Sequence, residues 1–432
     1  MTTFEFLEFL SLNPYTYLWC LLLALTVFGF VMKRTTSSWF NPLRFNIFTF
    51  SIGVSVVFFL NYLGCISWQT FTYVICSMVI FWLTFITIFK NKQRNVNITF
   101  TDEPVIARYL FYLSYFLFIS LTLVSYKALG IPAFNEEGRL STFTGSNLGF
   151  IYRIAPILNA YSVIYIIHLF SEKGGLHKKI SAFLFLLPIL IIGILSGSRS
   201  SFLIIIFAFW GYRTFYLNKE PKASDYKLLA APMVIFSILS FLINAEGDLN
   251  RVFFMVYERI VASGDLYWEA LPDETWKAVV VNNPLKFTFM GLLGPLRILN
   301  PTQAEIPIGF QLTSIIYPSI AGSNTGPVAL FPVFGLVCFG YYGGLIFSFL
   351  QSFLVATLLR FTYIKSNSII VSVFSYYAFN NIITLIGDAS AGLGALLDIL
   401  VNLVVMTLLL LLVGAFYYYK DLFLKNTNLS KS

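Results

Sequence analysis

The chain has 432 residues, of which 58% are hydrophobic and only 11% are charged. A soluble domain is about half apolar and about a quarter charged, so this composition excludes an ordinary soluble protein and favours many membrane spans. The net charge of +8 does not indicate nucleic acid as a partner, because the basic residues follow the links between apolar blocks. No basic stretch precedes the first apolar residues, so the sequence predicts no cleavable signal peptide.

Apolar blocks of roughly 20 residues, separated by short polar links, predict an all-α, polytopic membrane protein with about eleven spans. The predicted spans are 15–32, 43–63, 69–89, 107–126, 150–170, 180–196, 200–217, 228–245, 337–360, 367–386 and 392–418. One long segment has no such block. The predicted division is therefore an N-terminal bundle at 1–245 with a small outer loop at 127–149, a large non-spanning segment at 246–336, and the last helices with a short tail at 337–432.

The basic residues predict which side each link occupies. Most of the 28 lysines and arginines lie in links 33–44, 90–108, 171–179, 213–227 and 360–366 and in the tail from Lys420. Because basic links favour the cytoplasm, the N-terminus and the large segment are predicted to lie outside, with the C-terminus inside. In this topology, most of the 20 carboxylates lie on the outer side. If the cell is a bacterium, its outer face has no ATP or nucleotide sugar, and the energy for any chemistry there would have to arrive stored in a lipid-linked substrate.

Five arginines near the predicted outer face are candidate ligands for an anionic group. Arg199 lies in the tip 196–201 at the start of a predicted helix, where free N–H groups and the helix dipole favour an anion. Arg153 lies one turn into the fifth span, where an unpaired charge is costly. The other three are Arg139 in the small loop and Arg251 and Arg297 in the large segment. The alternative for each is exposure at the surface or snorkelling to lipid headgroups.

Three carboxylates are candidate general bases. Asp265 and Glu269 lie four residues apart in a predicted amphipathic helix at 251–270, so they share a helix face beside Tyr267 and Trp268. Aromatic rings stack on sugars and carboxylates accept hydroxyl protons, which suits a carbohydrate site; a solvated acidic face is the alternative. Asp388 lies near the outer end of the tenth span, and Asp398 lies inside the eleventh. Pairing with an arginine is the alternative for both.

Two further features complete the sequence-based interpretation. The run from Asn324 to Gly344 is rich in small residues, which let helices approach closely, and a half-span entering the membrane from outside is an alternative to a full span there. The cysteines have no metal-ligand spacing and are interpreted as packing residues; they are Cys20, Cys65, Cys76 and Cys338. The sequence predicts neither a metal site nor a cofactor.

This layout resembles the Wzy-type polymerases of oligosaccharide repeat units, relatives of the O-antigen ligases and of the SEDS peptidoglycan polymerases. The resemblance rests on Gly130-Ile131-Pro132 with the following Arg139, the hairpin Gly197-Ser198-Arg199-Ser200, one large late outer loop, and the run from Asn324-Thr325-Gly326-Pro327 to Gly343-Gly344. One departure concerns the enterobacterial-common-antigen polymerases, which carry Arg-Glu-Gly before the last span. This chain has Gly387-Asp388-Ala389-Ser390 there, without a basic residue.

The resemblance implies a GT-C-like glycosyltransferase of the bacterial inner membrane that needs no metal. It would pass a growing chain from undecaprenyl pyrophosphate to the end hydroxyl of a new lipid-linked unit on the periplasmic face. Arg199 with Arg153 or Arg297 would stabilise the leaving pyrophosphate, because arginine suits that anion. The base would be Asp265, Glu269 or Asp388, with Asp265 favoured.

The implied partners are the lipid-linked oligosaccharide, membrane lipids, a chain-length regulator and a flippase, without nucleic acid. Two other functions fit the sequence. An O-antigen ligase would have a similar layout and would transfer the chain onto a lipid A core. A flippase for lipid-linked oligosaccharides would be expected to have two related halves and charges along the middle of its spans.

Overall fold

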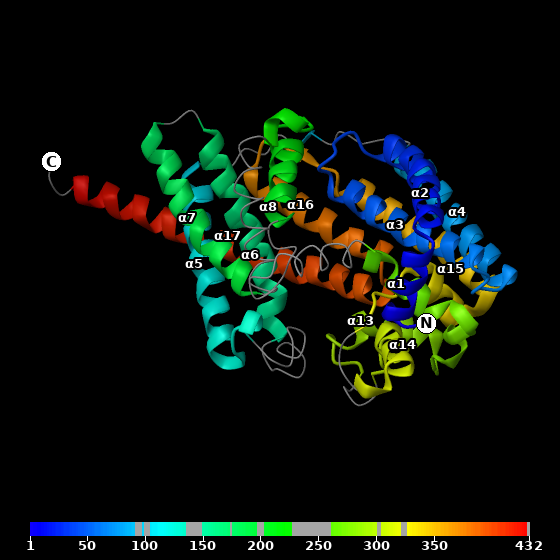
Figure 1. Cartoon of the computed structure of the whole chain (residues 1–432). Coiled ribbons are helices and arrows are strands. Elements are labelled where there is room, and N and C mark those ends of the chain that lie inside the picture. The colour runs from blue at the N-terminus through cyan, green and yellow to red at the C-terminus, as the bar shows by residue number, and fades with distance from the viewer. Residues whose placement is uncertain are drawn as a thin grey trace. The chain divides into compact units, whose positions relative to one another are not determined.

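The computed structural model describes residues 1–90, 97–98, 104–134, 149–172, 175–196, 203–226, 261–299, 304–320 and 326–429. Over these residues the chain is almost entirely helical, with only two short strands, β1 (Asn97–Ile98) and β2 (Lys365–Ser366). Nine helices in the described part are long and apolar enough to cross a membrane (Figure 1). The predicted class, an all-α polytopic membrane protein, is therefore confirmed.

These nine candidate spans coincide with nine of the predicted ones to within several residues at each end, except that α17 continues past the predicted end at 418 to Leu429. The helices are α2 (Pro14–Thr35), α3 (Pro42–Tyr62), α4 (Trp68–Lys90), α5 (Pro104–Leu129), α6 (Gly149–Ser171), α7 (Leu176–Leu195), α15 (Phe331–Thr362), α16 (Ile369–Ile383) and α17 (Ala389–Leu429). In place of the predicted span 200–217, the structure has α8 (Leu203–Gly211) continued by the π-helical turn η2 (Tyr212–Tyr216). This helix is shorter than the roughly 20 residues that a span needs. The predicted span 228–245 lies outside the described residues.

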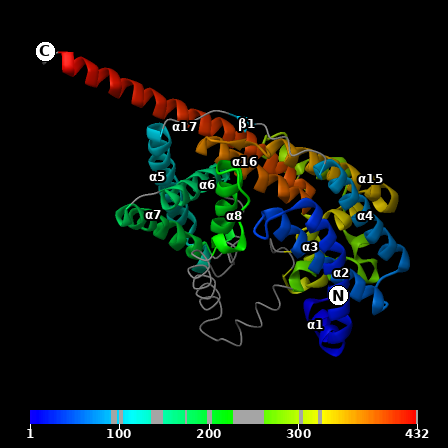
Figure 2. The same cartoon turned by 90° about the horizontal axis from the view of Figure 1, so that it is seen from above.

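The chain forms two compact units. Unit 1 comprises Met1–Arg94, Lys222–Thr362 and Phe379–Leu396, and unit 2 comprises Asn95–Pro221, Tyr363–Ala378 and Leu397–Ser432. Unit 1 takes residues from all three ranges of the predicted division, because the large non-spanning segment packs on spans from both ends of the chain. In unit 2, α6 contacts both α5 and α7, and Figure 2 shows these three helices beside one another.

Short helices complete each unit. Unit 1 contains α1 (Thr3–Leu12), η3 (Ala223–Tyr226), η4 (Ala262–Gly264), α11 (Asp265–Ala270), η5 (Pro272–Ala278), α12 (Pro284–Thr288), α13 (Met290–Leu293), α14 (Ile308–Ile316), η7 (Pro318–Ile320) and η8 (Thr384–Ile386). Unit 2 contains η1 (Pro132–Phe134). Proline at the first helical position begins several of these elements, because its fixed φ suits a helix start where an N–H has no helical partner.

Helix α15 consists of two helices, because Gly340 reverses the chain with a φ of 67° and a ψ of −169°. The rings of Phe334 and Phe347 stack 5.3 Å apart, whereas a continuous helix would separate these residues by roughly 20 Å. Phe331 begins the first arm and stacks on Phe81, near the middle of α4, at 4.1 Å. The first arm is thus a half-span beside α4, the alternative that the small residues of this run had suggested.

Close approach of two glycines holds this hairpin together. Gly335 on the first arm faces Gly344 on the second, and the Tyr73 side chain of α4 lies against both. The Tyr73 hydroxyl donates to the backbone oxygen of Pro332 at 2.9 Å. A side chain at either glycine would separate the arms, so the half-span depends on the absence of Cβ atoms here.

Links predicted to lie on the same side of the membrane meet in the structure. In unit 2, β1 from link 90–108 pairs in parallel with β2 from link 360–366. The Tyr363 hydroxyl beside β2 donates to Glu220, in link 213–227, at 2.7 Å. All three links are predicted to be cytoplasmic.

The predicted outer segments meet in unit 1 in the same way. The backbone N–H of Thr3 donates to the Tyr317 hydroxyl of the large segment at 2.6 Å. The N–H of Gly291 in that segment donates at 3.0 Å to the hydroxyl of Ser390, which lies in the predicted outer link between spans 367–386 and 392–418. These contacts agree with the predicted alternation of links, while the assignment of one side to the cytoplasm stays a prediction from charge.

Candidate functional site

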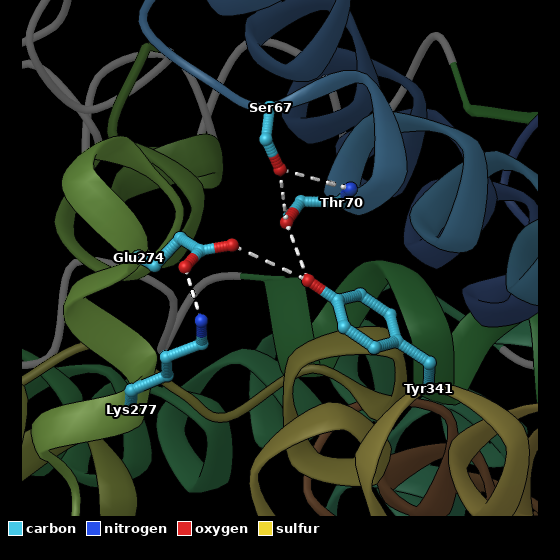
Figure 3. A network of polar contacts seen from close by, with 5 residues as sticks. All are labelled: Ser67, Thr70, Glu274, Lys277 and Tyr341. Atoms are coloured by element: carbon cyan, nitrogen blue, oxygen red, sulfur yellow. Dashed lines mark hydrogen bonds and ion pairs between the residues drawn. The ribbon is translucent and has the colours of Figure 1, made fainter.

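A chain of polar side chains joins the large segment to the start of α4 and to the start of the second arm of α15 in unit 1 (Figure 3). The oxygens of Thr70, on α4, and Tyr341, on the second arm of α15, lie 3.0 Å apart. The Tyr341 hydroxyl donates to Glu274 Oε1 at 3.5 Å, and Glu274 Oε2 pairs with the Lys277 ammonium. The Ser67 hydroxyl donates to Thr70 Oγ1 at 2.9 Å. Since the Tyr341 hydroxyl donates to Glu274, it can accept from Thr70, which accepts from Ser67, so the donors run in one direction, from Ser67 to Glu274.

Aromatic rings surround this carboxylate. Trp276 lies edge-on to Tyr341, with ring centroids 5.7 Å apart, and the Lys277 ammonium lies over the Trp276 ring. The Trp276 Nε1 atom is buried and has no hydrogen-bond acceptor among the described residues. Thr70 is fully buried, whereas the Glu274 side chain is 32% exposed. The network therefore has a fixed inner end and an accessible carboxylate at its outer end.

The backbone that carries this carboxylate is strained. Asp273 and Glu274 are consecutive non-glycine residues in the left-handed region, with φ angles of 52° and 53°. Each such residue costs roughly 1–2 kcal/mol, and strained positions of this kind concentrate at binding and catalytic sites. Leu271 and Pro272, which precede them, are buried and hold the turn in place. The turn that these residues form brings the Glu274 carboxylate within hydrogen-bond distance of the Tyr341 hydroxyl.

The predicted pair of Asp265 and Glu269 lies in α11, which is a buried helix. Trp268 is 1% exposed and stacks on Phe6 of α1 at 4.3 Å, and Tyr267 is 0% exposed. Their rings are therefore covered by protein in this structure and offer no open surface for a sugar. Asp265 is half-buried and accepts the N–H of Leu266 at 2.8 Å.

Burial also changes the chemistry of Glu269. The side chain is 5% exposed, and its Oε2 atom has no hydrogen-bond donor among the described residues. Burial, together with the nearby charge of Asp265, raises the pKa of Glu269 to about 7, and a hydrogen bond from Thr313 of α14 opposes this shift. The carboxyl is thus neutral in part at neutral pH.

The raised pKa of Glu269 predicts a stability that decreases as pH rises. Below about pH 4.5 the carboxyl is protonated in the folded and in the unfolded chain. Between about pH 4.5 and pH 7 it is ionised in the unfolded chain but still mostly protonated in the folded one. The free energy of unfolding should therefore decrease over this range by up to about 3 kcal/mol and stay low above it. Glu269→Gln should remove this dependence, as measured by thermal unfolding at pH 5 and pH 8. Glu8→Gln, a change at an exposed position of α1, is the control. An unchanged pH dependence in Glu269→Gln would contradict the assignment.

The third predicted base, Asp388, caps helix α17. Its Oδ1 atom accepts the N–H of Ala391 at 3.0 Å, and its backbone oxygen accepts that of Gly392 at 2.9 Å. Burial raises the pKa of Asp388, while backbone hydrogen bonds from Ala391 and Ser390 lower it. A side chain bound in this way stabilises the helix start, so a structural role accounts for its position.

The candidate arginines have different surroundings. Arg297 is exposed at a left-handed φ of 56° after α13, and its side chain has no partner in the described part of the chain. Arg153, in unit 2, pairs with Asp398, which is the pairing that the sequence had offered as an alternative for that carboxylate. Arg139, Arg199 and Arg251 lie outside the described residues.

Comparisons of the chain with protein-family models, with curated proteins and with solved structures find no match. The candidate site is accordingly defined by geometry. It consists of the half-exposed carboxylate of Glu274, its hydroxyl partner Tyr341, the ring of Trp276 and the ammonium of Lys277.

Sequence reasoning missed Glu274, although a signal for it was present. The runs Asp265-Leu266-Tyr267-Trp268 and Asp273-Glu274-Thr275-Trp276 both place carboxylates before a tryptophan. The first run is followed by Glu269 and then by the apolar residues Ala270 and Leu271, so its charges alternate with apolar residues. The second run follows a proline, and three of the five residues from Asp273 to Lys277 are charged. Apolar neighbours predict burial and charged neighbours predict exposure, so the second run was the better candidate.

Proposed function

We propose that this protein is a glycosyltransferase of the bacterial inner membrane that joins lipid-pyrophosphate-linked oligosaccharide units at the outer face, with Glu274 as general base. The observation that carries the proposal is the half-exposed Glu274, beside Trp276 and Tyr341, at the ends of two spans. A carboxylate and aromatic rings at a membrane surface suit a sugar whose carrier lies in the bilayer.

The proposed reaction assigns each group a step. The hydroxyl oxygen of the acceptor sugar attacks the anomeric carbon of the donor chain and forms the new glycosidic bond. The bond from that carbon to the lipid pyrophosphate breaks, and the pyrophosphate leaves with the bonding electrons. Glu274 takes the hydroxyl proton, and Tyr341 orients the carboxylate by donating to Oε1.

The leaving pyrophosphate needs positive charge, and the proposal assigns this role to arginines. Arg297 is exposed on the same segment as Glu274 and is free of a side-chain partner among the described residues. Arg139, Arg199 and Arg251 stay candidates on the basis of their predicted outer positions. The GT-C-like fold, the periplasmic position of the site and a chain-length regulator as partner belong to the same proposal.

Purified protein with a lipid-pyrophosphate-linked repeat unit tests this function directly. With neither nucleotide nor added metal, we expect a ladder of products on a gel, because the energy of transfer is stored in the substrate. Transfer to a lipid A core without a ladder would instead identify a ligase. Absence of any transfer product would contradict the proposed function.

A lipid-linked oligosaccharide flippase is the second candidate. The observation that favours it is the Arg153–Asp398 pair, because charged side chains inside spans often line a transport path. Movement of a lipid-linked sugar across vesicles that contain the protein, without elongation, would support this function and exclude the polymerase.

A further inference from the structure

Two spans of unit 2 bring opposite charges together. The guanidinium of Arg153, near the start of α6, donates through Nη1 to Oδ1 of Asp398 in α17. The side chains are 31% and 26% exposed, so the pair is open on one side within unit 2. Charged residues inside spans are rare and are functional candidates by default.

One buried amide fixes the backbone at both charges. Asn402 is 0% exposed, and its Nδ2 atom lies 2.8 Å from the backbone oxygen of Arg153, 2.7 Å from that of Asp398 and 2.7 Å from the Tyr377 hydroxyl. If the Asn402 amide were turned over, its oxygen would face the backbone oxygens of Arg153 and Asp398, and none of these three atoms can donate. The orientation of the amide is therefore fixed. The Oδ1 atom of Asn402 is buried without a partner among the described residues.

The turn of α6 that carries Arg153 also contains Pro156, which has no N–H to donate to the preceding turn. Asn402 supplies a donor to this turn from α17. Pro156 lacks the N–H that would reach the carbonyl of Tyr152, and Asn402 contacts the next carbonyl along, that of Arg153. Asn402 thus joins α17 to this turn of α6 at the residue that bears the charge. Arg153 and Asp398 are therefore held in position before any ligand binds.

The pair uses only part of the guanidinium. Arginine has five N–H donors and binds carboxylates and phosphates best through two parallel hydrogen bonds. Arg153 makes one bond to one carboxylate oxygen, and its other N–H groups have no partner in the described part of unit 2. A pair that served only to neutralise charge would gain from a second bond, so the geometry leaves room for another acceptor.

We infer that Arg153 binds a phosphate-class oxyanion and that Asp398 is an internal competitor that holds the guanidinium until this anion displaces it. Asn402 is a positioning residue, since it contacts the backbone of both and the charge of neither. A lipid diphosphate is the expected source of the anion, and this identification rests on the proposed function. The anion site itself does not depend on Glu274.

Binding to the purified full-length protein in discs of neutral lipid tests the inference, with farnesyl diphosphate and inorganic pyrophosphate as probes. Asp398→Asn should tighten binding of farnesyl diphosphate about tenfold because the competitor is removed, and Arg153→Gln should weaken it at least tenfold. Glu172→Gln, which removes a carboxylate paired with Lys178 in the same unit, should have no effect. Glu274→Gln should also bind normally, which separates a failure of this site from a failure of catalysis.

The direction of the Asp398→Asn effect decides the inference. If the ion pair is only structural, farnesyl diphosphate should bind Asp398→Asn and Arg153→Gln either more weakly or as well as it binds the unchanged protein. That result would overturn the inference. If Asp398→Asn does not fold, Arg153→Lys keeps the charge without the planar fork and should bind several-fold more weakly at unchanged stability; unaltered binding would then overturn the inference. Equal affinity for inorganic pyrophosphate would overturn the lipid as source.

Discussion

Replacing Glu274 by glutamine is expected to lower the rate of glycosyl transfer by at least about 100-fold while the lipid-linked substrate still binds. Glutamine has the same shape and can still accept from the Tyr341 hydroxyl, but it cannot take a proton from the acceptor sugar. General bases contribute about 10²–10⁴-fold to such reactions. The measurement is the initial rate of ladder formation, together with the concentration of acceptor unit that gives half the maximal rate.

Two further variants control this experiment. Glu305→Gln changes a carboxylate of the same segment that accepts the N–H of Asn282, and it should leave the rate unchanged. Tyr341→Phe removes the hydroxyl that orients Glu274 and should lower the rate by a smaller factor, about tenfold, because the base itself remains. A fully active Glu274→Gln protein would exclude this residue as the base and return half-buried Asp265 to first place.

Replacing Gly344 by alanine is expected to lower the free energy of unfolding by about 3 kcal/mol. An alanine Cβ would lie against the Tyr73 hydroxyl and 2.9 Å from the backbone carbon of Gly335, so the half-span could not keep its place. Overpacking of a tight contact typically costs about 1–3 kcal/mol, and the hydrogen bond from Tyr73 to Pro332 would be lost as well. The midpoint of thermal unfolding should decrease by roughly 3 °C, since the entropy of unfolding of a chain of 432 residues is large.

Gly29→Ala is the matched control, since no atom lies within 4 Å of the position that its Cβ would take in α2. This variant should keep the midpoint of unfolding, because alanine favours helix over glycine. Tyr73→Phe combined with Gly344→Ala should be less harmful than the sum of the two single changes, because removing the hydroxyl relieves part of the clash. Strictly additive effects would contradict the contact between Tyr73 and Gly344.

Most of the architecture was predictable because membrane spans are a local property of the chain. An apolar block of roughly 20 residues can cross a membrane regardless of which helices lie beside it. Helices α2 to α7 therefore appear close to their predicted bounds. The same local reasoning placed a polar segment between the eighth and ninth predicted spans. It also assigned links 90–108 and 360–366 to one side of the membrane, with which the contact of β1 with β2 agrees.

The candidate site was less predictable, because exposure of a side chain depends on distant partners. The helix with Asp265 and Glu269 had suitable residues at suitable spacing, yet Phe6 and the neighbouring helices cover it. Glu274 lacked helical spacing but is positioned by two left-handed residues and by Tyr341. No periodicity in the sequence reports such a turn.

Amino-acid order alone was therefore enough for the class of fold, most of the spans and the alternation of their links, since these follow from the length and polarity of neighbouring residues. Tertiary structure decided which carboxylate is open, that α15 folds back at Gly340, and that Arg153 meets Asp398. The physical reason is that burial, close approach and ion pairing join residues far apart in the chain, and their energies depend on distance in space.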